Sequence, residues 1–270
     1  MRIISISALA VGFCLAAVCS LWGAAAAASV SGPSPGQDAA IYMDRLGTKL
    51  SSAAEHALAL ECFNESIEHN SSYADAWLHR ANSEKALKNY NASRQSLQRA
   101  VQADGRSAAA WSALADSFTL EKDYENASAA ASTLTEIDPG NKAHWLKKAS
   151  IEQMRGDFEA AGEDLDRAIG IDPKYKEAIY RKALCALSAS DSHAALQLLD
   201  QAIAIDPKYK QAHAARGMAL QAQGDYEGAV RAFDRALQID AKWAPALSGK
   251  MNALLALGRD REAADILLRL

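Results

Sequence analysis

The chain has 270 residues and a formal net charge of −4, with 50% hydrophobic and 23% charged residues. This balance excludes a wholly disordered chain and a strongly basic nucleic-acid-binding protein. Aromatic residues make up only 7%, while alanine, leucine and charged residues, which lose little side-chain entropy in a helix, predominate. The composition therefore predicts an all-helical protein.

The first 28 residues have the pattern of an export signal. Arg2 is the only charged residue before Asp38, and the segment after it is apolar or small up to a run of alanines that ends at Ala28. This pattern is typical of a secretory signal peptide. Because about 20 apolar residues also span a bilayer, an uncleaved signal-anchor is the alternative.

Both interpretations place the remaining chain outside the cytoplasm, either secreted or tethered to the outer face of the cell membrane. Residues 29–39 contain Pro33, Pro35 and Gly36, and we expect them to form a flexible linker.

From Ala40 to the last residue, the sequence repeats every 34 residues without an insertion or a deletion. Trp77, Trp111 and Trp145 are 34 residues apart, and their frame extends in both directions along the chain. The seventh repeat is truncated. The repeats cover residues 40–73, 74–107, 108–141, 142–175, 176–209, 210–243 and 244–270.

Each repeat has the pattern of two antiparallel helices. Positions 4, 7, 8 and 11 form one helical stripe, which we expect to face inward. Position 8 is Gly or Ala in six repeats, position 20 is Ala in six, and position 24 is mostly Phe or Leu. Turns such as Gly156-Asp157 join the two helices, and Asp-Pro ends the second helix in three repeats.

This pattern resembles that of the tetratricopeptide repeat (TPR) family, most clearly in the sixth repeat with Gly217, Gly224, Tyr226, Ala229 and Phe233. The resemblance covers residues 40–270. It implies an all-α fold, an α-solenoid of seven antiparallel helix pairs in a right-handed superhelix. It also implies a non-catalytic scaffold whose concave groove binds a protein or peptide.

No pattern of a catalytic, cofactor or metal site occurs in the sequence. A phosphate-binding loop, a G-x-G-x-x-G motif and an H-E-x-x-H motif are all absent. Asp191, Ser192 and His193 have the residue types of a triad but are consecutive, which favours an N-cap turn. Cys62 and Cys185 lie four repeats apart, too far for a disulfide in a solenoid. We therefore expect no enzyme activity, no cofactor and no bound metal.

The charge balance likewise predicts no nucleic-acid partner, and it limits membrane contact to the N-terminal segment, if that segment is uncleaved.

Four of the eight asparagines begin an N-x-S sequon, all in repeats one to three and on the second helix or the turn after it. On an exported chain these sequons predict N-glycosylation. The alternative is chance together with serines that cap helices. The four residues are Asn64, Asn70, Asn91 and Asn126.

In TPR-like stacks, positions 2, 5, 9, 12 and 13 of the first helix line the concave groove. These positions are more polar in repeats one to three, as at Asp44 and Asp75 but not at Leu78 and Leu120, and largely apolar in repeats four to six. An apolar groove suggests an adaptor that binds an unidentified protein or peptide. Packing against the next repeat is the alternative. The apolar groove residues are Leu146, Met154, Tyr180, Leu184, Leu187 and Met218.

One TPR subclass binds a C-terminal carboxylate through a lysine at position 5 and an asparagine at position 9 of its first repeat. The corresponding residues are Asp44 and Thr48, so this binding mode is not implied.

The hexapeptide I-D-P-K-Y-K occurs twice, at residues 171–176 and 205–210. Its lysines, placed beside tyrosine at one edge of the solenoid, could meet an acidic partner or a glycan. The alternative is that each tyrosine packs under the following helix.

The C-terminal helix lacks a polar capping helix after it, which solenoids usually need. Ala263, Leu267 and Leu270 fit the inward stripe, whereas Ile266 and Leu268 do not. We expect a weak homodimer through this exposed face, or else a blunt, tolerated edge. The same reasoning supports an alternative function, a structural or assembly protein of the cell envelope that multimerises through its solenoid ends.

Overall fold

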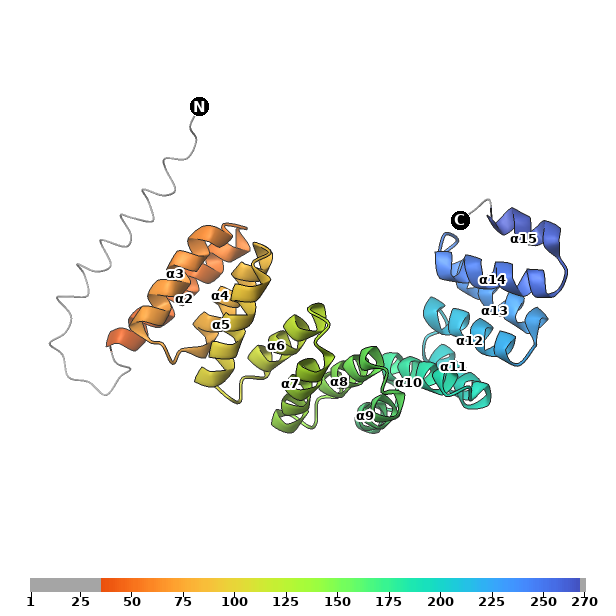
Figure 1. The fold of residues 1–270 in the computed structure, drawn as a ribbon, viewed down its shortest axis with the longest axis horizontal. Coiled ribbons are helices and arrows are strands. Elements are labelled where there is room, and N and C mark those ends of the chain that lie inside the picture. Colours follow the sequence, from red (N-terminus) through yellow and green to blue (C-terminus); the bar gives the residue numbers. More distant parts are fainter. Residues whose placement is uncertain (1–34, 268–270) are drawn as a thin grey trace, which may run out of the picture. The chain divides into compact units, whose positions relative to one another are not determined.

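The structure is a computed structural model that describes residues 35–267 (Figure 1). Within this range the chain forms fourteen α-helices and no strand. The described residues divide between Gly105 and Arg106 into two compact units, called unit 1 (35–105) and unit 2 (106–267). The predicted signal segment, residues 1–28, lies outside the described residues, and no described helix is long and apolar enough to cross a membrane.

Each unit consists of consecutive helix pairs, in which the second helix also packs against the first helix of the next pair. Unit 1 contains α2 (Pro35–Ser52), α3 (His56–His69), α4 (Ala74–Ala86) and α5 (Tyr90–Ala103). Unit 2 contains α6 (Ala108–Leu120), α7 (Tyr124–Ile137), α8 (Lys142–Arg155), α9 (Phe158–Ile171), α10 (Lys176–Ser188), α11 (Ser192–Ile205), α12 (Lys210–Ala222), α13 (Tyr226–Ile239), α14 (Ala244–Ala256) and α15 (Asp260–Leu267).

These helices confirm the predicted all-α solenoid and its 34-residue frame. In repeats two to seven the first helix begins at the first residue of the repeat. The right-handed superhelix stays a prediction. The helix α2 differs from expectation because it begins at Pro35, inside the predicted linker 29–39. Proline suits the first turn of a helix, where its missing N–H costs nothing, and Asp38 there interacts favourably with the helix dipole.

The turn between the two helices of a repeat uses the same backbone conformation each time. Position 15 has a positive φ in all seven repeats, between 61° and 89°. Glycine adopts this left-handed conformation without strain, whereas other residues do not. Glycine fills the position in three repeats, all in unit 2; the seven residues are Ala54, Lys88, Lys122, Gly156, Ser190, Gly224 and Gly258.

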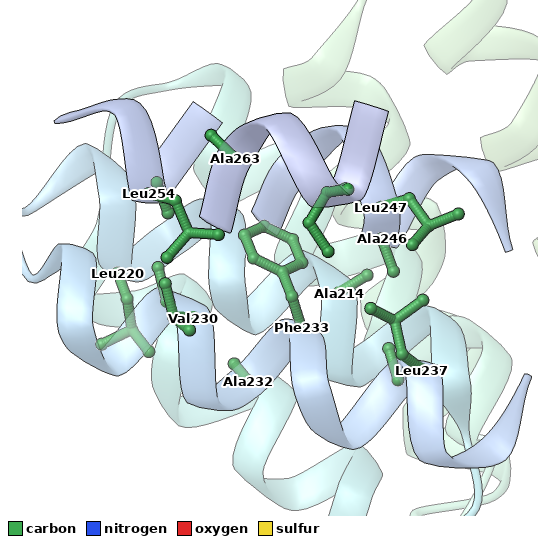
Figure 2. Packing of buried hydrophobic residues seen from close by; sticks show 14 residues of the cluster. Ala214, Leu220, Val230, Ala232, Phe233, Leu237, Ala246, Leu247, Leu254 and Ala263 are labelled. Atoms are coloured by element: carbon green, nitrogen blue, oxygen red, sulfur yellow. The ribbon is translucent and has the colours of Figure 1, made fainter. Parts of the chain in front are cut away.

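The small residue at position 8 makes room for the residue at position 24, as the sequence predicts. Phe233 lies at the centre of the cluster in Figure 2, with Leu247 and Leu254 beside it. A Cβ atom at Gly217 would lie 2.7 Å from Phe233 Cζ, and one at Gly249 would lie 2.4 Å from it. Where position 24 is leucine in repeats two, four and five, position 8 is alanine instead, and in repeat four Leu165 and Ala149 are both fully buried. The volumes at the two positions therefore compensate.

The predicted inward stripe is wrong at position 7. This position holds Arg or Lys in five repeats, and these side chains are only half-buried. Their stems cover apolar surface while the cations pair with second helices: Lys182 with Asp166, Arg216 with Asp200, and Lys250 with Asp234.

The assignment of the last helix is wrong by one residue. In α15, Ala263 and Ile266 are buried, whereas Leu267 is 61% exposed. Position 8 of this repeat is Met251 rather than a small residue, so position 24 has no space to enter. Because Ile266 is part of the core, it cannot contribute to the predicted homodimer face. Leu268 and Leu270 lie outside the described residues.

Candidate functional site

The first helices of neighbouring repeats lie side by side within each unit. In unit 2, α10 contacts both α8 and α12, and α12 contacts α14. In unit 1, α2 contacts α4. Each unit therefore has a layer of first helices, and the predicted groove positions lie on this layer.

The six predicted groove residues differ in exposure. Met154 on α8 and Met218 on α12 are 53% and 54% exposed. The other four, Leu146, Tyr180, Leu184 and Leu187, are half-buried and pack against the cores of repeats four and five. We call these six residues together the apolar face of unit 2.

Tyr180 is the groove residue most strongly held by packing. Its ring meets that of Tyr209 at a centroid distance of 5.3 Å, edge to face. Burial raises the pKa of Tyr180. For Tyr180 the structure therefore favours packing within the solenoid over contact with a partner. For Met154 and Met218 both interpretations stay open.

The predicted binding face left out two further exposed apolar residues in the same register, one of them an apolar exception among the groove positions of repeats one to three. Leu120 on α6 is 57% exposed and occupies the same repeat position as Met154. Leu255 on α14, at position 12, is 49% exposed. Extending the groove positions into repeat seven would have found Leu255.

Polar contacts join the first helices beside the apolar face. Lys147 Nζ on α8 lies 2.6 Å from Asp116 Oδ1 on α6. The Gln153 side chain on α8 accepts a hydrogen bond from Arg181 Nη1 on α10 at 2.9 Å. It also donates one to the backbone carbonyl oxygen of Arg181 at 3.0 Å. These contacts fix the relative position of the helices that carry the apolar side chains.

Unit 1 has a different feature at the equivalent place, a cavity of about 630 Å³ lined by residues from α2 to α4. Its lining combines aromatic rings with charged groups of both signs. The lining residues are Tyr42, Asp44, Arg45, Leu46, Thr48, Lys49, Tyr73, Asp75 and His79.

A buried carboxylate organises this cavity. Asp44 is only 4% exposed; its Oδ1 accepts a hydrogen bond from His79 Nδ1 at 2.7 Å, and its Oδ2 accepts one from the Tyr73 hydroxyl at 3.4 Å. The hydrogen bond to Asp44 raises the pKa of His79, although burial opposes it. Burial, with the charge of Asp44, raises the pKa of Tyr73 to about 12. The Tyr73 hydroxyl therefore stays protonated at neutral pH and donates its hydrogen bond to Asp44.

This arrangement can bind a ligand or link the two helices, but it does not form a recognised catalytic or metal site. No group of three metal-ligating side chains occurs among residues 35–267. The sequence offered one signal for the cavity: Asp44 and His79 occupy positions 5 and 6 of adjacent repeats. The sequence pattern places Asp44 among the polar groove positions but does not pair it with His79.

The second lysine of each hexapeptide, Lys176 or Lys210, makes side-chain contacts within its own repeat. Lys176 Nζ lies 5.2 Å from the centroid of the Tyr209 ring and 2.6 Å from Asp206 Oδ2. Lys142 makes the same contacts with Tyr175 and Asp172, and Lys210 with Trp243 and Asp240. The structure thus favours the packing interpretation over a binding edge.

The four sequons are not equivalent in the folded chain. In three of them the serine is buried and bonded: Ser66 donates to the Ala40 carbonyl, Ser93 donates to the Ala81 carbonyl, and Ser128 donates to Glu152. These serines have a structural role in the helix packing. The fourth sequon, at Asn70, lies in the loop between α3 and α4, where Ser72 is exposed.

The two cysteines among the described residues are free and buried. Burial raises the pKa of the Cys62 and Cys185 thiols, so both behave as small apolar side chains.

Models of the tetratricopeptide repeat match residues 45–105, 80–142, 123–176, 153–219 and 211–243. No curated protein matches the chain. A solved tetratricopeptide repeat protein from Parabacteroides merdae is similar, with a TM-score of 0.69 and 12% identity over 84% of this chain and 90% of its own.

Two further solved structures share the fold at 19% identity. The pilF protein of Pseudomonas aeruginosa has a TM-score of 0.60, covering 73% of this chain and 90% of its own. YrrB, described as a TPR protein with an unusual peptide-binding site, has a TM-score of 0.58, covering 71% and 98%.

Proposed function

Because the chain belongs to the tetratricopeptide repeat family, we propose that it is an exported, non-catalytic adaptor that binds a segment of a partner protein. The segment lies across the apolar face of unit 2. The exported location rests on the apolar N-terminal segment of the sequence.

The exposure of Met154 and Met218 is the observation that carries this proposal. Two large apolar side chains, each more than half exposed, lie on helices that both contact α10. Between them, Leu184 and Leu187 are only half-buried. Methionine adapts its shape to different apolar partners, and contiguous exposed apolar surface marks interaction sites.

Site-specific photocrosslinking tests where the partner binds. A benzoylphenylalanine placed at position 154 or 218 should crosslink to a protein of the cell envelope. The same group at position 171 or 205, where Ile171 and Ile205 are 41% and 37% exposed at the ends of second helices, should not.

Charged substitutions test the chemistry of the face. Met154→Asp with Met218→Asp should abolish crosslinking from position 184, because burying an unpaired polar group under a ligand costs about 2–7 kcal/mol and an ionised carboxylate costs more. Helicity should be unchanged, since both side chains are exposed. Ile171→Asp with Ile205→Asp is the matched control. Crosslinking that persists in the methionine variant would place the partner elsewhere.

The export proposal has its own test, in which the chain is recovered from envelope and medium and its N-terminus is sequenced. A start near residue 29 indicates cleavage, an intact Met1 in the envelope indicates an anchor, and a cytoplasmic chain would contradict export.

A further inference from the structure

Charge at two repeat positions distinguishes the first repeat from the sixth. Positions 22 and 26 lie one turn apart on the second helix. Repeats two to five combine neutral or opposite charges there, namely Gln95 and Arg99, Ala129 and Thr133, Glu163 and Arg167, and Gln197 and Gln201. Repeat one instead has Glu61 and Glu65, and repeat six has Arg231 and Arg235.

The two arginines of repeat six border a cavity of about 280 Å³ between α11, α12 and α13. We call it the basic cleft; it is lined by Asp200, Ile203, His213, Arg216, Arg231, Ala232 and Arg235. Arg216 Nε already pairs with Asp200 Oδ1 at 2.7 Å. Arg235 donates to the amide of Gln238 at 2.9 Å, and Arg231 pairs with no acidic group among the described residues. The charges of Arg231 and Arg235 are therefore uncompensated.

A histidine in place of a tryptophan contributes to this cleft. In repeats two and four, the indole N–H of Trp77 and Trp145 donates to a backbone carbonyl of the preceding loop. In repeat six, His213 Nε2 donates the equivalent hydrogen bond to the Pro207 carbonyl at 3.0 Å. The imidazole ring that makes this bond is smaller than an indole ring. The corresponding cavity beside Trp77 measures about 210 Å³.

The glutamates of repeat one form an acidic ridge on α3, consisting of Glu61, Glu65 and Glu68. They recur at i, i+4 and i+7 on one side of the helix, and none forms an ion pair with another described residue. Glu61 and Glu68 are exposed and Glu65 is half-buried. Like charges one turn apart repel each other in an isolated helix. Both the ridge and the cleft thus retain charges that a partner could neutralise.

We propose that the acidic ridge of one molecule docks into the basic cleft of a second copy of this chain. The two surfaces carry opposite charges at the same two positions of equivalent helices, so their spacing matches. A guanidinium binds a carboxylate through two parallel hydrogen bonds, and Ile203 and Ala232 provide an apolar floor to the cleft. The ridge and the cleft are different surfaces, so the contact is heterologous and each molecule carries both halves of it.

This association is independent of the proposed adaptor function because it uses second helices and not the apolar face. Exposed ion pairs are individually weak and are screened by salt. The assembly therefore forms at low ionic strength and dissociates as salt is added.

Sedimentation velocity of the full chain, purified from its own cells, tests the proposal. At about 100 µM protein, the mean sedimentation coefficient should rise with concentration in about 30 mM NaCl, and the association constant should fall more than tenfold in about 300 mM NaCl. Glu61→Arg with Glu65→Arg should sediment as a monomer, as should Arg231→Glu with Arg235→Glu.

Mixing the two charge-reversed variants should restore association because each then meets a surface of opposite charge. A chain with all four reversals should also associate with itself. The control Glu163→Arg with Arg167→Glu, which exchanges charges at the same positions of repeat four, should behave as wild type. A wild-type monomer at low salt, a reversed variant that still associates, or a mixture that stays monomeric would overturn the proposal.

Discussion

Unit 1 contains six of the ten polar or charged side chains that are buried in the described residues, although it has fewer than a third of those residues. Asp44, Glu84 and four serines lie in its interior. Unit 2 instead forms continuous apolar clusters around residues such as Leu199 and Phe233. The same 34-residue plan thus carries a larger share of buried polar side chains in unit 1 than in unit 2.

The N-termini of the second helices also differ between the two units. In unit 2, four second helices begin with an aspartate whose side chain accepts a hydrogen bond from a backbone N–H of the first turn: Asp123, Asp157, Asp191 and Asp225. In unit 1, Glu55 and Asn89 make no such bond. A cap of this kind stabilises a helix by about 0.5–2 kcal/mol, so we expect unit 1 to be the less stable of the two.

The candidate binding surfaces, which lie on the layer of first helices, also differ between the two units. Unit 1 presents a charged cavity around Asp44 and His79, whereas unit 2 presents the apolar face. A fold that repeats its backbone can therefore vary its binding chemistry along the chain by exchanging residues on its first helices.

The largest expected effect concerns the two buried phenylalanines. Phe233→Ala and Phe63→Ala should each cost about 3–5 kcal/mol of stability. The loss should be greater at Phe233 because its ring contacts glycines in two repeats, Gly217 and Gly249, whereas that of Phe63 contacts Gly47. Urea unfolding measures both. Combining Phe233→Leu with Gly217→Ala recreates the pairing of the leucine repeats and should recover much of the loss.

Phe158→Ala is the control, since Phe158 is 40% exposed, and it should have a much smaller effect. A larger loss at Phe63 than at Phe233 would contradict this comparison of the two cores.

An intermediate effect is expected from the Asp44–His79 pair. Because the folded state raises the pKa of His79, the pair stabilises unit 1 fully below the ordinary histidine pKa, and this stability is lost as pH rises through the folded pKa. In unit 2, the lysine partners of Asp172 and Asp206 lower the pKa values of these two carboxyl groups. The stability that these ion pairs contribute is therefore lost only when the pH falls. Raising the pH from about 6 to 9 should therefore destabilise unit 1 alone.

Hydrogen exchange, corrected for its intrinsic pH dependence, measures this effect by comparing α2 and α4 with α10 and α12. His79→Gln should cost about 2 kcal/mol at pH 6 because Asp44 then lacks its charged partner, and the cost should shrink at pH 9. Asp44→Asn combined with His79→Gln should remove the pH dependence. Equal pH dependence in both units would show that the pair does not control unit 1.

The smallest effect is expected at the left-handed turns. Lys88→Gly should stabilise unit 1 by about 0.5–1 kcal/mol because φ at Lys88 is 64° and glycine adopts this value without strain. Gly156→Ala in unit 2, at a φ of 89°, should have the opposite sign. Thermal unfolding measures both variants. Destabilisation by Lys88→Gly would mean that the lysine side chain contributes more than the backbone strain costs.

Repeat boundaries, helix pairs and the small residues at positions 8 and 20 could be predicted because each recurs in most copies of the same local pattern. The start of α2 at Pro35 and the burial of Ile266 could not, since both depend on packing at the ends of the array, where the repeat pattern stops. The cavity around Asp44 also escaped prediction. It depends on the rotation of α2 relative to α4, which brings together residues 35 positions apart.

The methyl groups of the methionines provide the most direct test that the apolar face of unit 2 binds a protein segment. Peptides selected on the protein from a random displayed library are added to a chain labelled at its methionine methyl groups, and NMR spectra are recorded. The resonances of Met154 and Met218 should shift and broaden together in a saturable manner, while that of Met43, buried in unit 1, stays unchanged. Selected peptides that leave Met154 and Met218 unshifted would contradict the proposed binding face.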